Sequence, residues 1–364
     1  MRAASFHPQS SNGHGTIRIA ATSTALPPYS ISQEESRRYL GKVFSIDPKW
    51  LDAMLSVIGN SQIKQRFLVY PVDYLIQPRP LSQISREYQE HAVRLGRQVA
   101  EDCLERAGMK PQDIDLLITV SCTGVMIPSL DAHLINDMGF RQDVRRLPIT
   151  ELGCAGGAAS ISRAWEYLRG FPEANVLVIS VELSSLTFQR GNLTPENLIS
   201  SILFGDGAAA AIITGGEGPG PKILDTSTYL FPNSLRAMGF DLKESGLTIV
   251  LSKDVPQMIR EKIAGLVTAF LGRHSLCKEK ISAFVLHPGG QKLMQYMEEE
   301  LGLEPQHTGF SWDVLREYGN LSSASVFFVL HEWLTKRSLS NGAYGLMAAF
   351  GPGFSAELLL LQWP

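Results

Sequence analysis

The same ordered set of short motifs occurs twice along this chain, and this repetition constrains the fold more than any other feature. Each half carries a glycine between two apolar residues, then a glycine followed by Cys154 or Asn320, then a glycine turn before an apolar strand. The paired motifs are residues 138–140 and 301–303, 153–154 and 319–320, and 204–207 and 350–353. A duplicated α/β unit would place Cys154 and Asn320 at corresponding helix starts, facing one site between the halves. Chance similarity between glycine-rich turns is the alternative.

Short apolar runs alternate with helical patterns between these motifs. The expected strands are residues 17–22, 114–121, 176–181, 208–214, 281–286 and 357–362, and the expected helices are residues 83–107, a segment from 132 and a segment through 161–168. Such alternation favours βαβ units and layered sheets with helices outside and between them. The Gly/Pro-rich residues 215–221 are the best candidate for the link between the two halves of the chain. We therefore expect halves at 16–220 and 221–364, preceded by a disordered arm at 1–15.

Composition and charge exclude several classes of protein. The chain has 364 residues, of which 44% are hydrophobic, and its net charge is −3. This length is enough for two core-sized units. No basic block is present, so we expect no nucleic-acid partner. No apolar run approaches the roughly 18 residues of a membrane helix, so we expect a cytoplasmic protein without a membrane span. Four cysteines without CxxC spacing argue against a disulfide scaffold and a zinc site, and we expect no metal.

Cys154 stands where a loop is expected to enter a helix, because residues 155–160 are small or short and residues 161–168 follow helical spacing. Free backbone N–H groups and the positive end of the helix dipole at such a position favour thiolate over thiol, the form that a nucleophile needs. The alternative is a structural cysteine packed among alanine and glycine. The other three cysteines are weaker candidates for the nucleophile.

His287 follows the strand expected at residues 281–286 and precedes Pro-Gly-Gly. This position is the carboxyl end of a strand, where open α/β sheets place ligand sites. Taken alone, His287 also fits a structural histidine, and Asn320 fits a helix N-cap. Together with a thiolate at Cys154 they support acyl-thioester chemistry: the thiolate accepts an acyl group, and His287 and Asn320 hold the charge that forms on a second thioester carbonyl.

Five motifs occur in an order that makes the chain resemble type III polyketide synthases, the chalcone-synthase-like branch of the thiolase fold. They are Gly-Cys154-Ala-Gly-Gly, Leu-Phe204-Gly-Asp-Gly-Ala-Ala, His287-Pro-Gly-Gly, Gly-Asn320-Leu-Ser-Ser-Ala and Phe-Gly-Pro-Gly353. The resemblance covers nearly everything after residue 16. It implies a homodimeric enzyme with a five-layered αβαβα fold built from two duplicated halves, which uses coenzyme A thioesters directly and needs no metal or redox cofactor.

The resemblance also implies a role for each motif residue. Cys154 would carry the acyl starter and then the growing chain, and His287 would form an ion pair with its thiolate. His287 and Asn320 would bind the malonyl thioester oxygen while decarboxylation generates the enolate for a Claisen condensation. Phe204 matches an aromatic gatekeeper between the coenzyme A tunnel and the cavity. The substrates implied are malonyl-CoA and an acyl-CoA starter.

The chain departs from the plant members of this family around the cavity. Ile249 stands where those enzymes have a second gatekeeper phenylalanine, and Phe240 fills a position usually occupied by glycine. The residues expected to line the cavity are Cys122, Thr123, Ser184, Thr187, Phe204, Phe240, Ile249 and Ser322. Ile127 matches a residue that reaches into the cavity of the partner subunit, so the site is expected to be incomplete in a monomer.

Coenzyme A recognition is expected to differ as well. The basic residues that plant enzymes use for the phosphates correspond here to Ala53, Ser56 and Asn60. Lys64 and Arg66 lie nearby and are the expected coenzyme A ligands. A carrier protein is an alternative donor of the starter.

Variant motifs at residues 121–124, 129–135, 153–157 and 252–256 look more like those of microbial alkylpyrone and alkylresorcinol synthases. This similarity leads to the hypothesis of a medium- or long-chain fatty acyl starter, extended by two or three malonyl units. One alternative is an initiating ketoacyl carrier-protein synthase, which shares the cysteine, histidine and asparagine on the same fold. Another is an inactive binding or scaffold protein, against which the presence of all three residues argues.

Overall fold

The computed structural model describes residues 15–44, 47, 49 and 62–364. The predicted disordered arm, apart from Gly15, and the positions Ala53, Ser56 and Asn60 lie outside these described residues. Within the described part of the chain, no helix combines the length and the apolar character needed to cross a membrane.

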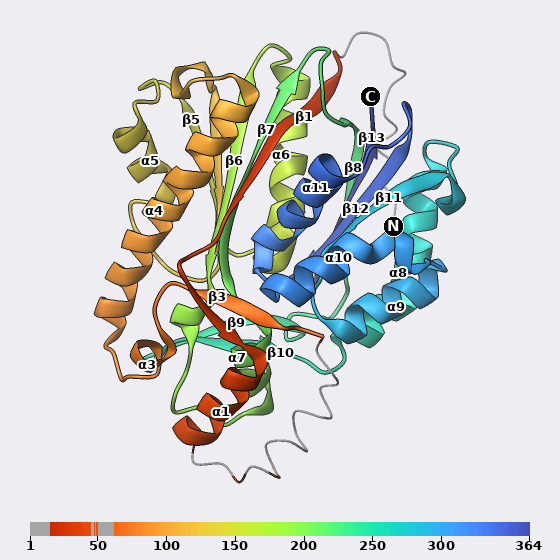
Figure 1. The fold of residues 1–364 in the computed structure, drawn as a ribbon. Helices are drawn as coiled ribbons and strands as arrows, with labels where there is room; N and C mark the ends of the chain where they lie inside the picture. The colour runs from red at the N-terminus through yellow and green to blue at the C-terminus, as the bar shows by residue number, and fades with distance from the viewer. Residues whose placement is uncertain (1–14, 45–46, 48, 50–61) are drawn as a thin grey trace.

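A nine-stranded mixed sheet runs through the molecule (Figure 1). In spatial order its strands are β11 (Ile281–Leu286), β12 (Tyr344–Gly351), β13 (Ser355–Gln362), β8 (Lys222–Leu230), β1 (Ile17–Ala25), β7 (Asp206–Gly215), β6 (Asn175–Leu183), β4 (Leu116–Val120) and β5 (Arg145–Ile149). The two parts of the sheet meet where β1 pairs with β8, at Arg18 and Lys222. Most inner strands are continuously apolar, as expected for a sheet covered on both faces.

The two parts of the sheet repeat one topology. In the first, β1 and β6 run antiparallel to β7, and β4 runs parallel to β6. In the second, β8 and β12 run antiparallel to β13, and β11 runs parallel to β12. The internal repetition of the sequence therefore reflects a repeated structural unit, and β5 is the strand of the first part that lacks a counterpart. The residue boundaries expected for the two halves stay a prediction.

Helices form three layers around the two parts of the sheet (Figure 1). The first layer holds α4 (Leu81–Ala107) and α5 (Leu130–Met138), the middle layer α6 (Gly156–Gly170) and α11 (Ser325–Lys336), and the third layer α8 (Val255–Gly272) and α9 (Gln291–Leu301). A large hydrophobic cluster belongs to each layer. The predicted five-layered α/β thiolase-like fold is thus confirmed, and α10 (Pro305–Tyr318) packs beside α11 and β11.

The middle layer explains the run of small residues after Cys154. A Cβ atom added to Gly157 would lie 2.2 Å from the carbonyl oxygen of Ser323 and 2.8 Å from Cγ1 of Val326. Such distances are far below van der Waals contact, so only glycine allows α6 to approach the start of α11 this closely. The starts of these two buried helices are consequently neighbours, as the repeated motifs predicted.

Short elements outside the nine-stranded sheet form one end of the molecule (Figure 1). They are β2 (Tyr29–Ser32), α1 (Gln33–Phe44), β3 (Gln65–Leu68), α3 (Val72–Leu75), α7 (Pro195–Leu203), β9 (Met238–Lys243) and β10 (Gly246–Leu251). The pairs β2–β3 and β9–β10 are separate two-stranded sheets.

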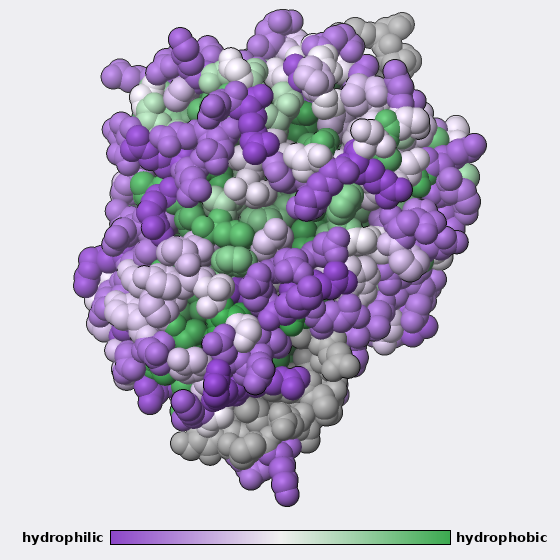
Figure 2. Space-filling view, in the orientation of Figure 1, coloured by the Kyte–Doolittle hydropathy of each residue, from purple (hydrophilic) through white to green (hydrophobic). Residues whose placement is uncertain are grey.

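The surface seen in the orientation of Figure 1 is mostly hydrophilic, and apolar residues show between α4 and α11 (Figure 2).

Candidate active site

Cys154 lies in a short 3₁₀ turn, Gly153–Ala155, directly before α6. Its predicted position at a helix start is therefore confirmed, and it is 6% exposed. Gly153 has φ +47°, and a Cβ atom there would lie 2.5 Å from Cδ of Pro352. Pro352, in the glycine turn of the second half, thus packs against Gly153. This contact fixes the position of the neighbouring Cys154.

His287 directly follows β11, and its backbone N–H donates to the carbonyl of Ala348 at 2.8 Å. The predicted position at the carboxyl end of a strand is confirmed. The residue is 2% exposed, and its ring Nδ1 is buried without a hydrogen-bond partner. A buried polar atom without a hydrogen-bond partner is uncommon in native proteins. Nδ1 of His287 is therefore available to bind a ligand.

Asn320 lies between α10 and the 3₁₀ turn Ser322–Ala324 that precedes α11. Its side-chain Oδ1 accepts from the N–H of Ser322 at 2.7 Å, as a helix cap does. Its Nδ2 donates to the carbonyl of Gly289 at 3.3 Å, in the loop after His287. The side chain therefore both caps a helix start and spans to the loop that carries the histidine.

Two cavities meet at Cys154. The first, which we call the His287 cavity, is lined by Cys154, His287, Asn320 and Phe204 among others. The second, which we call the apolar cavity, is lined by Cys154 and Phe204 but not by His287 or Asn320. Cys154, Phe204 and Met238 line both. The three residues singled out from the sequence are thus brought together, and Phe204 stands at the boundary between two cavities.

Residues predicted to line a pocket lie on the wall of the apolar cavity. They are Cys122, Thr123, Ser184, Thr187, Phe240, Ile249 and Ser322. Phe240 and Ile249 are paired across β9 and β10, so the two departures from the plant pattern are neighbours on one wall. Ile127 lines neither of these cavities and is 93% exposed.

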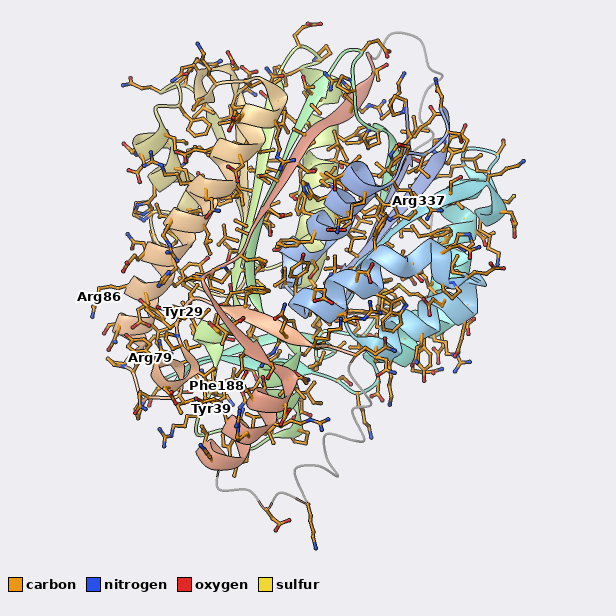
Figure 3. All side chains as sticks on the ribbon, viewed as in Figure 1. Tyr29, Tyr39, Arg79, Arg86, Phe188 and Arg337 are labelled. Atoms are coloured by element: carbon orange, nitrogen blue, oxygen red, sulfur yellow. The ribbon has the colours of Figure 1, made fainter. Side chains whose placement is uncertain are left out.

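The apolar cavity has an arm of apolar side chains that extends toward α1 and α3. We define this apolar arm as Ile31, Tyr39, Leu40, Val43, Leu68, Val72, Leu75, Ile76 and Phe188. Figure 3 labels Tyr39 and Phe188, which lie close together beside α1 in this view. No motif in the sequence indicated this arm.

Arg66, which was predicted to bind coenzyme A, is a buried residue. It is 4% exposed, and its guanidinium donates to the carbonyl of Phe204 at 2.9 Å and to Oγ of Ser36 at 2.5 Å. This burial argues against the expected contact of Arg66 with coenzyme A phosphates. Lys64 is exposed and forms an ion pair with Glu317 at 2.9 Å, and its role stays a prediction.

The electrostatics of the site favour neutral groups. Burial raises the pKa of the Cys154 thiol to about 12, although a hydrogen bond with Ser322 opposes the shift. Burial also lowers the pKa of His287 to about 3. Among the described residues, the Cys154 thiol donates to Oγ of Ser322 at 3.5 Å rather than to His287. Burial alone therefore favours the neutral thiol and the neutral imidazole over the thiolate–imidazolium pair implied by the resemblance.

Glu182 is a buried carboxylate beside Cys154 that the sequence reasoning missed. It is 0% exposed and accepts hydrogen bonds from the hydroxyls of Thr123, at 2.9 Å, and Ser323, and from the N–H of Cys122 at 3.2 Å. Burial raises the pKa of Glu182, and these donors oppose the shift. A charged residue near the end of the apolar strand at 176–181 was the available signal, because acidic residues are rarely buried without a specific environment.

The described residues contain no cluster of three or more histidine, cysteine, aspartate or glutamate side chains able to hold a metal ion. The donors that converge here are a thiol, an imidazole and an amide. That set suits acyl transfer, in which a nucleophile forms a thioester and two donors hold a developing oxyanion.

Comparison with known proteins gives the same chemistry. The N-terminal domain model of the chalcone and stilbene synthases matches residues 5–219, and the C-terminal domain model matches residues 222–363. A putative chalcone synthase of Bacillus subtilis is 35% identical over 95% of this chain and 98% of that protein. The 1,3,6,8-tetrahydroxynaphthalene synthase of Streptomyces peucetius is 36% identical over 95% of this chain and 93% of that protein.

Solved structures agree with the sequence matches. The crystal structure of 1,3,6,8-tetrahydroxynaphthalene synthase from Streptomyces coelicolor, a bacterial type III polyketide synthase, superposes with a TM-score of 0.91 at 33% identity, covering 95% of this chain and 99% of that chain. A polyketide synthase from the brown alga Ectocarpus siliculosus superposes with a TM-score of 0.89 at 29% identity, covering 98% and 100%. The chain therefore belongs to the chalcone and stilbene synthase family and is a type III polyketide synthase, an acyltransferase that performs decarboxylative condensation of malonyl-CoA.

Proposed function

We propose that this synthase loads a medium- or long-chain fatty acyl group on Cys154 and extends it with two or three malonyl units to an alkylpyrone or alkylresorcinol-type product. The observation that carries the proposal is the position of Cys154 at the junction of two cavities. One cavity holds the imidazole and amide donors. The other continues into the apolar arm, whose side chains match an alkyl chain in character.

The proposed reaction assigns one task to each of three residues. The Cys154 sulfur attacks the starter thioester while His287 accepts the thiol proton, and the coenzyme A thiol leaves with a proton. A malonyl thioester then loses carbon dioxide, and N–H donors of His287 and Asn320 hold the enolate oxygen that results. The enolate carbon forms a bond to the carbonyl carbon of the Cys154 thioester, the bond to the Cys154 sulfur breaks, and the sulfur regains its proton from His287. The lengthened chain is now a coenzyme A thioester, and its transfer back to Cys154 releases coenzyme A and begins the next extension. No step in this scheme requires a metal or redox cofactor.

Coenzyme A enters, in this proposal, through the His287 cavity. Lys253 and Lys292 line that cavity and are exposed. They are placed to meet the phosphates, a task for which the buried Arg66 is unsuited. A starter delivered by a carrier protein would pass along the same route.

The starter is tested by incubating the pure enzyme with malonyl-CoA and a series of acyl-CoA thioesters from acetyl to palmitoyl, followed by mass spectrometry of the products. The expected result is a preference for medium or long chains and products that retain the alkyl group. Two of the relatives compared above are named for making tetrahydroxynaphthalene. Consumption of malonyl-CoA alone to an aromatic product, with no incorporation of acyl starters, would overturn the fatty acyl proposal.

The residue assignments are tested with Cys154→Gln. This variant should lose condensation but retain decarboxylation of malonyl-CoA to acetyl-CoA, because His287 and Asn320 remain in place. The matched control is Cys277→Gln, since Cys277 is exposed and lines neither cavity. Condensation at the wild-type rate in Cys154→Gln would refute covalent loading at Cys154.

We also propose that the working enzyme is a homodimer. Ile127 lies on the loop after Cys122 and is 93% exposed. Val125, two residues earlier on the same loop, is 59% exposed. Such protruding apolar side chains fit a surface that a second copy covers. Sedimentation of the wild type and of Ile127→Asp tests this: a wild-type monomer that is fully active would contradict the proposal.

A further inference from the structure

Arg66 is a buried cation where the two halves of the chain meet beside the site. It lies in β3, is 4% exposed, and donates to the carbonyl of Phe204 at 2.9 Å. Its second donor group reaches Oγ of Ser36 in α1 at 2.5 Å. One guanidinium thus connects α1 to the segment that carries Phe204.

The segment that carries Phe204 is in turn bonded to the segment that carries Asn320. The N–H of Asn320 donates to the carbonyl of Leu203 at 2.9 Å, and the N–H of Gly205 donates to the carbonyl of Asn320 at 3.0 Å. Phe204 and Asn320 form an isolated parallel bridge through these bonds. We call this contact the 204–320 bridge.

The stem of Arg66 packs against the glycines on both sides of the 204–320 bridge. A Cβ atom on Gly319 would lie 2.8 Å from Cγ of Arg66, and one on Gly205 would lie 3.4 Å from its Cβ. Gly319 also has φ +73°, which other residues rarely adopt. The aliphatic part of the Arg66 side chain therefore fills the space beside the 204–320 bridge, and its guanidinium donates a hydrogen bond to the Phe204 carbonyl.

Asp206 keeps this buried cation compatible with its surroundings. Its carboxylate accepts from the N–H groups of Val69 and Ser185, each at 2.8 Å, and from the Ser185 hydroxyl at 2.5 Å. Burial lowers the pKa of the Arg66 guanidinium to about 10, and the charge of Asp206 opposes this shift. An opposite charge nearby offsets part of the cost of burying a cation.

We propose that Arg66 is a positioning residue that fixes the 204–320 bridge, and through it the place of Asn320 and Phe204 relative to Cys154. This inference rests on the roles of Asn320 and Phe204 in the proposed function. Loss of Arg66 would displace Asn320 and weaken enolate binding. The backbone at Cys154 would keep its place, because Pro352 packs against Gly153 from another direction.

The experiment uses Arg66→Met and Arg66→Lys in the full-length enzyme. Lysine keeps the charge beside Asp206, but its single ammonium group lacks the planar fork that reaches both the Phe204 carbonyl and Ser36. The matched control is Arg79→Met, because the Arg79 side chain is equally buried, at 5% exposure, and forms an ion pair with Glu87. Three quantities are measured per folded enzyme: malonyl-CoA decarboxylation, condensation with an acyl starter, and alkylation of Cys154 by iodoacetamide.

Both Arg66 variants should lose about tenfold or more in the kcat of decarboxylation and condensation, since small displacements of a catalytic donor cost this much or more. Alkylation of Cys154 should stay within about twofold, and Arg79→Met should retain wild-type kcat. In an Asn320→Ala background, Arg66→Met should add less than about twofold to the loss. Multiplicative losses in that background, or full kcat in Arg66→Lys, would overturn the positioning role.

The two proposals can fail separately. A wild-type rate in Asn320→Ala would overturn the proposed role of Asn320, and this inference with it. A large loss in Asn320→Ala together with an unchanged kcat in Arg66→Met would overturn the positioning role alone.

Discussion

The apolar arm makes starter selectivity a quantity that can be calculated. Each methylene buried in an apolar environment contributes about 0.8 kcal/mol, which is a factor of roughly four in kcat/KM. A decanoyl starter has four more methylenes than a hexanoyl starter. Full burial in the arm therefore predicts a decanoyl-to-hexanoyl ratio of up to about 200. The ratio is obtained from initial rates of coenzyme A release at low starter concentration.

The variant Val43→Trp tests the placement of the alkyl chain in the arm. Val43 lies on the wall of the arm and is half-buried, so an indole there occupies the room of several methylenes. The decanoyl-to-hexanoyl ratio should fall at least about tenfold, while the hexanoyl rate changes little. Leu242→Trp is the control, because Leu242 is 72% exposed and lines neither cavity. An unchanged ratio in Val43→Trp, with folding intact, would refute the placement of the alkyl chain in this arm.

Three further outcomes are expected. Burial raises the pKa of Cys154, so its alkylation rate should climb roughly tenfold per pH unit between pH 6 and 9; a rate already constant there would show that an ion pair outweighs burial. Gly153→Ala should lower the free energy of unfolding by roughly 1–2 kcal/mol and slow alkylation of Cys154, because its Cβ would meet Pro352; unchanged thermal unfolding would contradict this. Lys292→Gln should raise KM for malonyl-CoA about fivefold at low salt, the equivalent of about 1 kcal/mol; an equal rise at high salt would argue against a phosphate contact.

The repeated topology and the positions of Cys154, His287 and Asn320 could be predicted from the sequence. Cys154 precedes a helix and His287 follows a strand, as predicted, because the local pattern of small and apolar residues determines both positions. Asn320 also stands before a buried helix. These features depend on residues that are adjacent in sequence, so a single chain displays them.

The sequence could not show which distant segments cover a given side chain. Arg66 resembles a surface residue of a short strand, and its burial depends on Ser36 and Phe204, which lie 30 and 138 positions away. Glu182 likewise acquires its partners from two other segments, at Thr123 and Ser323. The apolar arm combines side chains of several short elements that show no common period. Apart from the position of Glu182 at the end of an apolar strand, long-range packing of this kind leaves no local signal.

The close approach of α6 and α11 has a consequence for how such an enzyme can diversify. At Gly157 the two helices leave no room for a side chain, so we expect the centre of the protein to tolerate almost no substitution. The apolar arm, in contrast, is built on β2, β3, α1 and α3, which lie outside the nine-stranded sheet, and on Ile76 and Phe188. Mutations of the arm side chains can alter which chain fits, while Arg66 and Ser36 keep their contacts beside the 204–320 bridge. A saturation library should therefore yield altered starter preference at arm positions and inactive protein at the helix crossing.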